Sequence, residues 1–438
     1  MFTPNESHEQ MSFYTSFTEQ LNHQHPLYLL AEQIRWKMFE ESFAKHYRKD
    51  FGRPAKEIRL MVSLLMLKHL RNLSDETVVE QWSENAYYQY FSGKERFIAA
   101  VPCEASELVH FRHRIGEAGI ELILKESIRV NGKDGDEDRG ITDTTVQEKN
   151  ITYPTDNKLQ RKMIAKCLAI AEEEHIVLRQ SYRRTLKKLS YQQRMRHTIK
   201  GKKSSRKADR KVKTIAGRLV RELERNLPSG KYTTTLLLFS RVLSQKPEDK
   251  HKIYSLHEPH VQCMSKGKAH KKYEFGSKVS ITTTAKSGVI LGALNIPKNE
   301  YDGHTLDAAL EQQQRLTGRI LKEVFVDRGY RGVTEVRGTI IHSPKPFPKT
   351  TTYPQSKKLK DGFARRAAIE PRIGHLKSDH RLGRNFYKGL VGDNINVMLA
   401  AAAMNFKRMM NKWKYFLSWG WMFFTTDGYP AFYLINAG

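Results

Sequence analysis

The sequence has few cysteines, and none of them form a closely spaced pair. Among 438 residues there are three cysteines, at positions 103, 167 and 263. Structural zinc sites need pairs at short spacing, and small secreted proteins carry many cysteines for disulfides. The count therefore argues against a zinc-stabilised fold and against a disulfide framework, and it predicts a reduced protein.

Long apolar segments are also missing. The stretches 397–404 and 415–424 are rich in apolar or aromatic residues, but both are shorter than the roughly 20 residues that cross a bilayer. The first ten residues, MFTPNESHEQ, lack the basic start and apolar core of a secretory signal. We therefore expect a cytoplasmic protein with no membrane partner.

Acidic residues are scarce relative to basic ones. Lys and Arg number 75 against 47 Asp and Glu, which gives a formal net charge of +28. A positive charge this large repels itself, and its usual role is to attract phosphate groups. Because the length is typical of two or three domains and 39% of residues are hydrophobic, we expect a folded, nucleic-acid-binding protein.

The first 132 residues are predicted to form a helical N-terminal DNA-binding domain. Apolar residues recur at helical spacing from Ile58 onward, Ser74 is placed to cap the next helix, and a third helical stretch begins near Phe111. Two of these helices joined by a tight turn fit either a plain helical hairpin or a helix-turn-helix that reads bases. Plain hairpins are much the commoner of the two.

Residues 158–250 are predicted to be a helical and strongly basic insertion. Between residues 181 and 221 there are 16 Lys or Arg and one acid, Asp209. Such a run is often only a solvated helix face, but this imbalance favours contact with the DNA backbone. The candidate contacts are Arg183, Arg184, Lys187, Lys188, Lys202 and Lys203.

Residues 133–410 outside this insertion predict a mixed α/β domain, followed by an aromatic tail at 411–438. Strands are indicated by ITDTTV, KYEFGSKVSITTTA, GVILGALNIP and LKEVFVD, and a helix should end at Gly318. About thirty loop-like residues then lead to the segment FARRAAIEPRIGHLKSDHRLGR and to an apolar helix near 393–410. Strands and helices in this order indicate a mixed sheet flanked by helices.

Three acids stand out in this domain: Asp143, Asp327 and Glu370. Carboxylates that converge from different elements can hold two divalent cations, which activate the attacking oxygen and stabilise the leaving oxygen in phosphodiester chemistry. A single Asp at a strand end is more often a turn cap. Asp156 and Asp302 occupy comparable places, so position alone does not single out Asp143.

The chain resembles the DDE transposases of bacterial insertion sequences whose catalytic core is ribonuclease-H-like. The resemblance covers the helical N-terminal region, DTTVQEKNITYPTD, YSLHEPHVQCMSKGKAHKKYEFGSKV, VFVDRGYRG and RRAAIEPRIGHLKSDHRLGR. Many members carry the signature Tyr-x2-Arg-x3-Glu-x6-Lys, and here Arg366, Glu370 and Lys377 have that spacing. Phe363 stands at the Tyr position and lacks its hydroxyl.

The resemblance implies a transposase that binds terminal inverted repeats and catalyses metal-dependent strand cleavage and strand transfer. Asp143, Asp327 and Glu370 would be the catalytic acids and would bind two Mg²⁺ or Mn²⁺ ions, and Arg366 and Lys377 would contact phosphate. The partners implied are double-stranded DNA and a second copy of the chain, and the location is the bacterial nucleoid. The alternatives are a transposase-derived repressor that no longer cuts and a junction resolvase.

The spacing of the signature also has a simple helical meaning. Glu370 and Lys377 lie seven residues apart, nearly two helical turns, so they share one face of a helix. Arg366 shares that face only if the same helix already runs there. Pro371 leaves this open, because proline is tolerated in a first turn but kinks an established helix.

Overall fold

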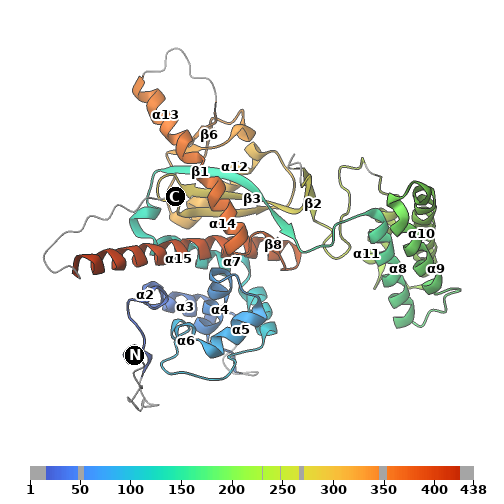
Figure 1. Cartoon of the computed structure of the whole chain (residues 1–438), viewed down its shortest axis with the longest axis horizontal. Helices are drawn as coiled ribbons and strands as arrows, with labels where there is room; N and C mark the ends of the chain where they lie inside the picture. The colour runs from blue at the N-terminus through green and yellow to red at the C-terminus, as the bar shows by residue number, and fades with distance from the viewer. Residues whose placement is uncertain are drawn as a thin grey trace, which may run out of the picture.

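The structure is a computed structural model that describes residues 16–47, 54–228, 230–246, 248–265, 271–344 and 353–424. It has a main body built around a sheet and a helical lobe that projects to one side (Figure 1). The three cysteines carry free thiols. Within the described ranges, no helix is both long enough and apolar enough to span a membrane.

The sheet at the centre of the body is mixed, as the sequence predicts. Its middle strand, β1 (Arg139–Lys149), pairs antiparallel with β3 (Tyr273–Thr284), which pairs antiparallel with β4 (Ile290–Ile296). On its other side β1 pairs in parallel with β5 (Glu323–Phe325), and β5 pairs in parallel with β7 (Thr339–His342). Short strands extend the sheet: β2 (Gln262–Ser265), β6 (Glu335–Val336) and β8 (Arg384–Asn385).

The expectation of some thirty loop-like residues after the β5 strand is wrong. This stretch contains the β6–β7 hairpin and most of helix α13 (Tyr353–Arg366). The strands escaped detection because they have two and four residues, and β7 is recruited by pairing with β5 rather than by its own composition. Residues 345–352 lie outside the described part of the chain.

The N-terminal part is helical. Ser74 accepts a hydrogen bond from the backbone amide of Thr77, which confirms it as an N-cap. The last helix begins before Phe111 and is kinked at Gly116, whose φ is +60°. The helices are α1 (Phe17–Gln20), α2 (Pro26–Gln33), α3 (Trp36–Ala44), α4 (Ile58–Leu70), α5 (Asp75–Glu84), α6 (Ala86–Phe91) and α7 (Ala105–Val130). A short 3-10 turn, η1 (Gly132–Gly135), leads into β1.

One hydrophobic core joins the N-terminal helices to the sheet. The long helix α15 (Gly389–Phe424) packs between them and contacts α7, α4 and β4. Helix α12 (Asp302–Thr317) contacts β4 and α7. It ends at Gly318, whose φ is +72°, as predicted. Because α15 runs well beyond residue 410, part of the predicted tail is helix, and residues 425–438 lie outside the described residues.

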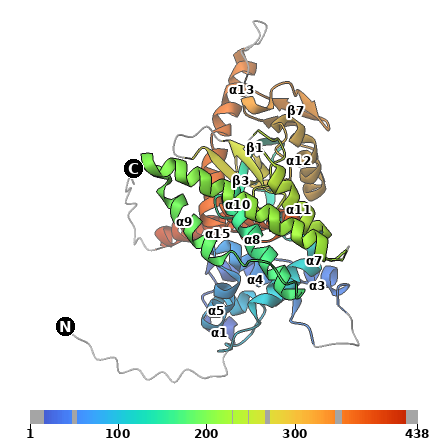
Figure 2. The same cartoon turned by 90° about the vertical axis from the view of Figure 1, so that its right-hand side faces the viewer.

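The lobe lies between β1 and β2 in the chain (Figures 1 and 2). It has a hydrophobic core of its own. Apolar residues that alternate with the cations mostly serve this core: Leu189 is buried, and Leu186 and Tyr182 are partly buried against it. Tyr191 is the exception, at 67% exposed. The helices are α8 (Asp156–Glu173), α9 (Arg183–Arg194), α10 (Ile199–Asn226) and α11 (Thr233–Ser244), with a turn η2 (Met195–His197).

Candidate active site

The pairing of β1 with β5 brings Asp143 and Asp327 together. In this parallel ladder Ile141 stands opposite Phe325, and each acid follows two residues later. Strand β5 ends at Phe325, whereas β1 continues, with Asp143 paired to Ile281 of β3. Both carboxylates therefore lie at the same level, at the carboxyl end of β5, where side chains of α/β proteins meet their ligands.

Arg366 connects the two carboxylates. Its Nη2 atom lies 3.1 Å from Oδ2 of Asp143 and 3.9 Å from Oδ2 of Asp327. The arginine is the last residue of α13, a helix that contacts β5. A guanidinium thus occupies the space between two acids that the sequence predicts as metal ligands.

The environment of Asp143 disfavours its negative charge. Burial is the largest cause that raises its pKa, to about 6, and the charges of Asp327 and Glu370 raise it further. Arg366 and the backbone amide of Thr144 act in the opposite direction. The pKa of an Asp surrounded by other acids rises because each added negative charge repels the next. A bound cation would relieve this repulsion.

Helix α14 (Ile369–Asp379) carries the third acid. Glu370 is exposed in its first turn, and Pro371 follows it there, where proline is tolerated. Lys377 lies seven residues further on in the same helix. Arg366 belongs to α13, and a short turn separates the two helices, so the alternative in which one helix carries Arg366, Glu370 and Lys377 is wrong.

Phe363 packs in an apolar cluster beneath these helices. Its ring meets that of Phe325 edge-on, with centroids 5.4 Å apart, and the cluster also contains Ile141 and Ile369. This contact anchors α13 to the sheet through ring packing, which needs no hydroxyl. The departure from the Tyr of the signature therefore leaves the anchoring role of the ring intact.

Asp327 is a turn cap as well as a member of the acid pair. Its Oδ1 atom accepts a hydrogen bond of 2.7 Å from the backbone amide of Gly329, in the turn η3 (Arg328–Tyr330). A methyl group at position 329 would lie 2.8 Å from Oδ1 of Asp327 and 3.0 Å from Oδ2 of Asp302, so a larger residue there would displace these carboxylates. The turn residues of RGYRG therefore hold one oxygen of Asp327 in place.

Asp302 and Tyr330 are neighbours of the site; the sequence showed Asp302 only as an acid comparable to Asp143, and it did not single out Tyr330. Asp302 accepts a 3.1 Å hydrogen bond from the hydroxyl of Thr144 and forms an ion pair with Lys278 at 2.9 Å. Tyr330 is fully buried, and its hydroxyl has no hydrogen-bond partner at standard geometry among the described residues. Burial, followed by the charge of Asp302, raises the pKa of Tyr330 well above its usual value.

Asp302 could not be distinguished from Asp156 in the sequence, because both begin a helix after a strand. The structure separates them. Asp156 lies in the lobe, where it accepts a hydrogen bond from Gln245 and pairs with Lys252. Asp302 instead ties α12 to β1, one residue from Asp143.

The donor chemistry of the site suits a hard divalent cation, because every candidate ligand is a carboxylate. In the described part of the chain, however, no group of three or more Asp, Glu, His or Cys side chains is arranged to hold a metal ion. Asp143 and Asp327 are placed together, while Glu370 is exposed on α14 and reaches Asp143 only through its charge. A metal-binding arrangement would require Glu370 to approach and Arg366 to withdraw.

The six candidate cations of the lobe are exposed, and all of them lie on α9 and α10. Asp209, the one acid of this run, is internal to the lobe: it accepts hydrogen bonds from Asn157 and Gln193 and pairs with Arg196 at 2.6 Å. Between residues 181 and 221 the exposed charge is therefore almost entirely basic.

The helical hairpin of α4 and α5 has a different character. Nearly all of α4 is buried, and the exposed side chains of α5 include Glu76, Glu80 and Glu84. An acidic helix face repels phosphate. An exposed face of this charge on α5 favours the plain hairpin, while DNA binding by this region stays a prediction.

Comparison with known proteins identifies the family to which the chain belongs. Residues 15–114 match a family described as a transposase domain (DUF772), and residues 248–406 match a transposase DDE domain. The chain is also similar to an uncharacterised protein, ORF8 in the nfe locus of Rhizobium meliloti. The two are 42% identical over 179 residues, which cover 40% of this chain and 86% of the relative. The chain belongs to the DDE transposases of insertion sequences.

The match to the DDE domain includes Asp327, Arg366, Glu370 and Lys377, whereas Asp143 lies before it. The mixed sheet of the transposase, with helices on its faces, is consistent with a ribonuclease-H-like core. No solved structure matches the chain significantly.

Proposed function

We propose that this transposase binds the terminal inverted repeats of its element and cuts them by divalent-metal-dependent hydrolysis. The 3′-hydroxyl that is freed would then attack target DNA in strand transfer. The observation that carries this proposal is the pair Asp143 and Asp327, held side by side around one guanidinium, with Glu370 close enough to act on Asp143. Mg²⁺ or Mn²⁺ is the metal class that carboxylates prefer.

Asp143, Asp327 and Glu370 would hold the metal. Two bound ions would supply activation of the attacking oxygen and stabilisation of the leaving oxygen. The amide of Thr144 donates a 2.8 Å hydrogen bond to Oδ1 of Asp143, and the amide of Gly329 does the same for Asp327, so each carboxylate is oriented by the backbone.

Arg366 has two roles in this proposal. Its charge offsets part of the negative charge of the acid pair, and it opposes the rise in the pKa of Asp143 that burial causes. If the acids held divalent ions, Arg366 would no longer be needed to balance their charge and could bind a DNA phosphate through two parallel hydrogen bonds. Lys377, on the helix that bears Glu370, would contact a neighbouring phosphate.

The DNA duplex would also lie along the lobe, since α9 and α10 present Arg183, Arg184, Lys187, Lys188, Lys202 and Lys203 to solvent. Backbone contacts of this type bind without sequence preference and weaken with salt. The domain limits 1–132, 133–410 and 411–438, DNA binding by the N-terminal domain, nucleoid association and action as a homodimer stay predictions. A dimer is expected because two element ends must be cut.

The test is cleavage of DNA that carries the element's own ends. We expect Asp143→Asn, Asp327→Asn and Glu370→Gln each to abolish Mg²⁺-dependent cleavage while binding to the ends persists. Asp156→Asn, an equal change at an acid of the lobe, should leave cleavage unaltered. Retained cleavage in any one of the three variants removes that residue from the catalytic set.

A second candidate function is a transposase-derived repressor that binds the ends without cutting them. The observation in its favour is the exposed position of Glu370, outside a closed group of metal ligands. If the wild-type protein binds the ends but shows no cleavage with either Mg²⁺ or Mn²⁺, and neither ion raises its melting temperature, the repressor is the better assignment.

A further inference from the structure

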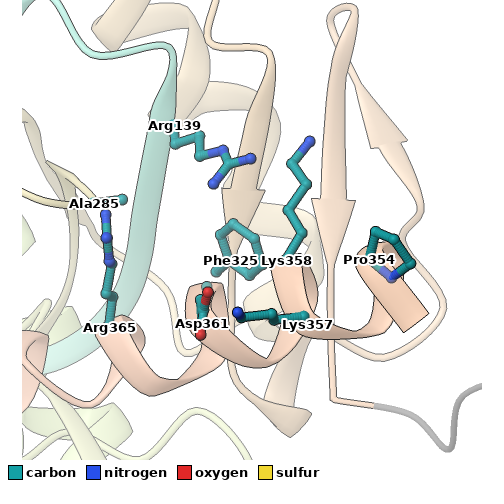
Figure 3. Close-up of a pocket in the computed structure, with 9 residues that line it drawn as sticks. Arg139, Ala285, Phe325, Pro354, Lys357, Lys358, Asp361 and Arg365 are labelled. Carbon is teal, nitrogen blue, oxygen red and sulfur yellow. The ribbon is translucent and has the colours of Figure 1, made fainter. Parts of the chain in front are cut away.

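A basic pocket lies further along α13 from the acids. It encloses about 300 Å³ between this helix and the sheet. Arg139 enters it from the start of β1, and Lys358 and Asp361 enter it from α13 (Figure 3). The other lining residues are Ala285, Phe325, Pro354, Lys357, Gly362 and Arg365.

The wall formed by α13 is held closely against the sheet. A methyl group at Gly362 would lie 2.2 Å from the ring of Phe325, so glycine permits an approach that no other residue allows. One position further on, Phe363 packs edge-on against the same ring. Because these contacts fix α13, the cations on it are presented at set positions rather than on a mobile arm.

The pocket has an excess of positive charge. Arg139 and Lys358 share one carboxylate, that of Glu323, at 3.4 and 2.5 Å. Lys357 and Arg365 are exposed, and neither has an ion pair with any residue that the structure describes. Asp361 is the one acid among the lining residues. Four cations with two nearby carboxylates leave a net charge that suits a phosphodiester.

The position of the pocket indicates which phosphate it would take. Helix α13 runs from the pocket to Arg366, which contacts Asp143, so one extended anion could touch both places. Arg139 precedes Asp143 by four residues on β1, which is about 13 Å at the rise of a strand. That length corresponds to about four nucleotides along the axis of a duplex.

We propose that the pocket between α13 and the start of β1 binds a backbone phosphate of the DNA strand that is cut. The bound phosphate would lie about four nucleotides from the scissile bond. This inference rests on the proposed function. The pocket would position the cut strand relative to the acids, whereas the lobe would bind DNA further from the acids.

The test uses a duplex that carries one element end, with a single uncharged methylphosphonate moved one position at a time along the cut strand. Binding is measured by fluorescence anisotropy without divalent ions. The variant is Lys357→Ala with Arg365→Ala, and its control is Lys125→Ala with Lys133→Ala, two exposed cations on α7 and η1. Circular dichroism checks that each protein is folded.

We expect the pocket variant to bind the unmodified duplex about tenfold more weakly at 0.1 M salt, with a salt slope reduced by one to two charges. One methylphosphonate position should weaken the wild-type and control proteins several-fold but leave the pocket variant unchanged. Equal losses for wild type and variant at every position would overturn the proposal. If wild type binds and cuts the ends, but no methylphosphonate position weakens it more than the pocket variant, only the assignment of the pocket is wrong. If wild type neither binds nor cuts the ends, the proposed function itself is wrong.

Discussion

Asp143→Asn should make this transposase more stable at neutral pH, although it removes an ion pair. The pKa of Asp143 is raised to about 6, chiefly by burial and then by the charges of Asp327 and Glu370. Relative to a usual value of about 4, and at about 1.4 kcal/mol per tenfold change in proton affinity, its charge costs about 3 kcal/mol. This cost already includes the attraction of Arg366. A neutral amide of the same shape avoids it.

The sign of the pH dependence follows from the raised pKa. The folded protein holds a proton on Asp143 between about pH 4 and pH 6, where the unfolded chain has lost it. The contribution of Asp143 to the stability of the wild-type protein therefore increases as the pH falls through 6. The variant lacks this pH-dependent contribution. We expect the variant to melt a few degrees higher than wild type at pH 8, with a difference that disappears near pH 4.

Thermal unfolding without divalent ions, followed at pH 4.5 and pH 8, measures this difference. Asp134→Asn is a control of opposite sign, because Lys412 and Arg408 donate to Asp134 and lower its pKa. That variant should be less stable at pH 8. Added Mg²⁺ should raise the melting temperature of wild type more than that of Asp143→Asn, since a ligand stabilises the state that binds it. If Asp143→Asn is no more stable at pH 8, or is equally shifted at both pH values, the electrostatic account of this site is wrong.

Three other outcomes are expected. Gly329→Ala should reduce cleavage at least tenfold, because the added methyl group would press on Asp327 and Asp302. The control is Gly374→Ala in helix α14, where an added methyl group meets no atom within 4 Å. This control should keep its activity and gain about 0.5–1 kcal/mol of stability. Changing the six lobe cations to Gln should lower affinity for every DNA sequence and flatten the salt slope; a loss confined to the element ends would contradict this. Lys68→Met should not lower the melting temperature at pH 7. Burial disfavours the charge of Lys68 and lowers its pKa to about 8, and Arg112 still pairs with Asp75 in the variant. A clear drop in melting temperature would show that the ion pair of Lys68 is needed.

The features that the sequence predicted well are those governed by near neighbours. Ser74 caps its helix, Gly318 ends another, and the strands around GSKVSITTT and GVILGALNI form where alternation and β-branched residues favour them. The three acids and the signature spacing were also visible. These features depend on residues close to one another in the sequence, so a short segment is enough to predict them.

Other features needed partners that lie far apart in the chain. The meeting of Asp143 with Asp327 depends on the register of β1 against β5, which no local pattern sets. Contacts between distant segments also place β7 beside β5 in the sheet. They likewise bring Asp302 to Thr144, next to Asp143. The break between α13 and α14 was undecided in the sequence, because Pro371 fits both a first turn and a kink.

Residue types and local spacing were available from the sequence: an excess of cations that suits a polyanion, the three acids, and Arg366, Glu370 and Lys377 at the spacing of a transposase signature. Tertiary structure alone decided how these groups stand toward one another. Packing of α13 on Phe325 places Arg366 between Asp143 and Asp327, while Glu370 starts a separate helix and stays exposed. The reason is physical: residue types fix charge and ligand class, but distances between side chains follow from strand register and helix packing, which the whole fold determines.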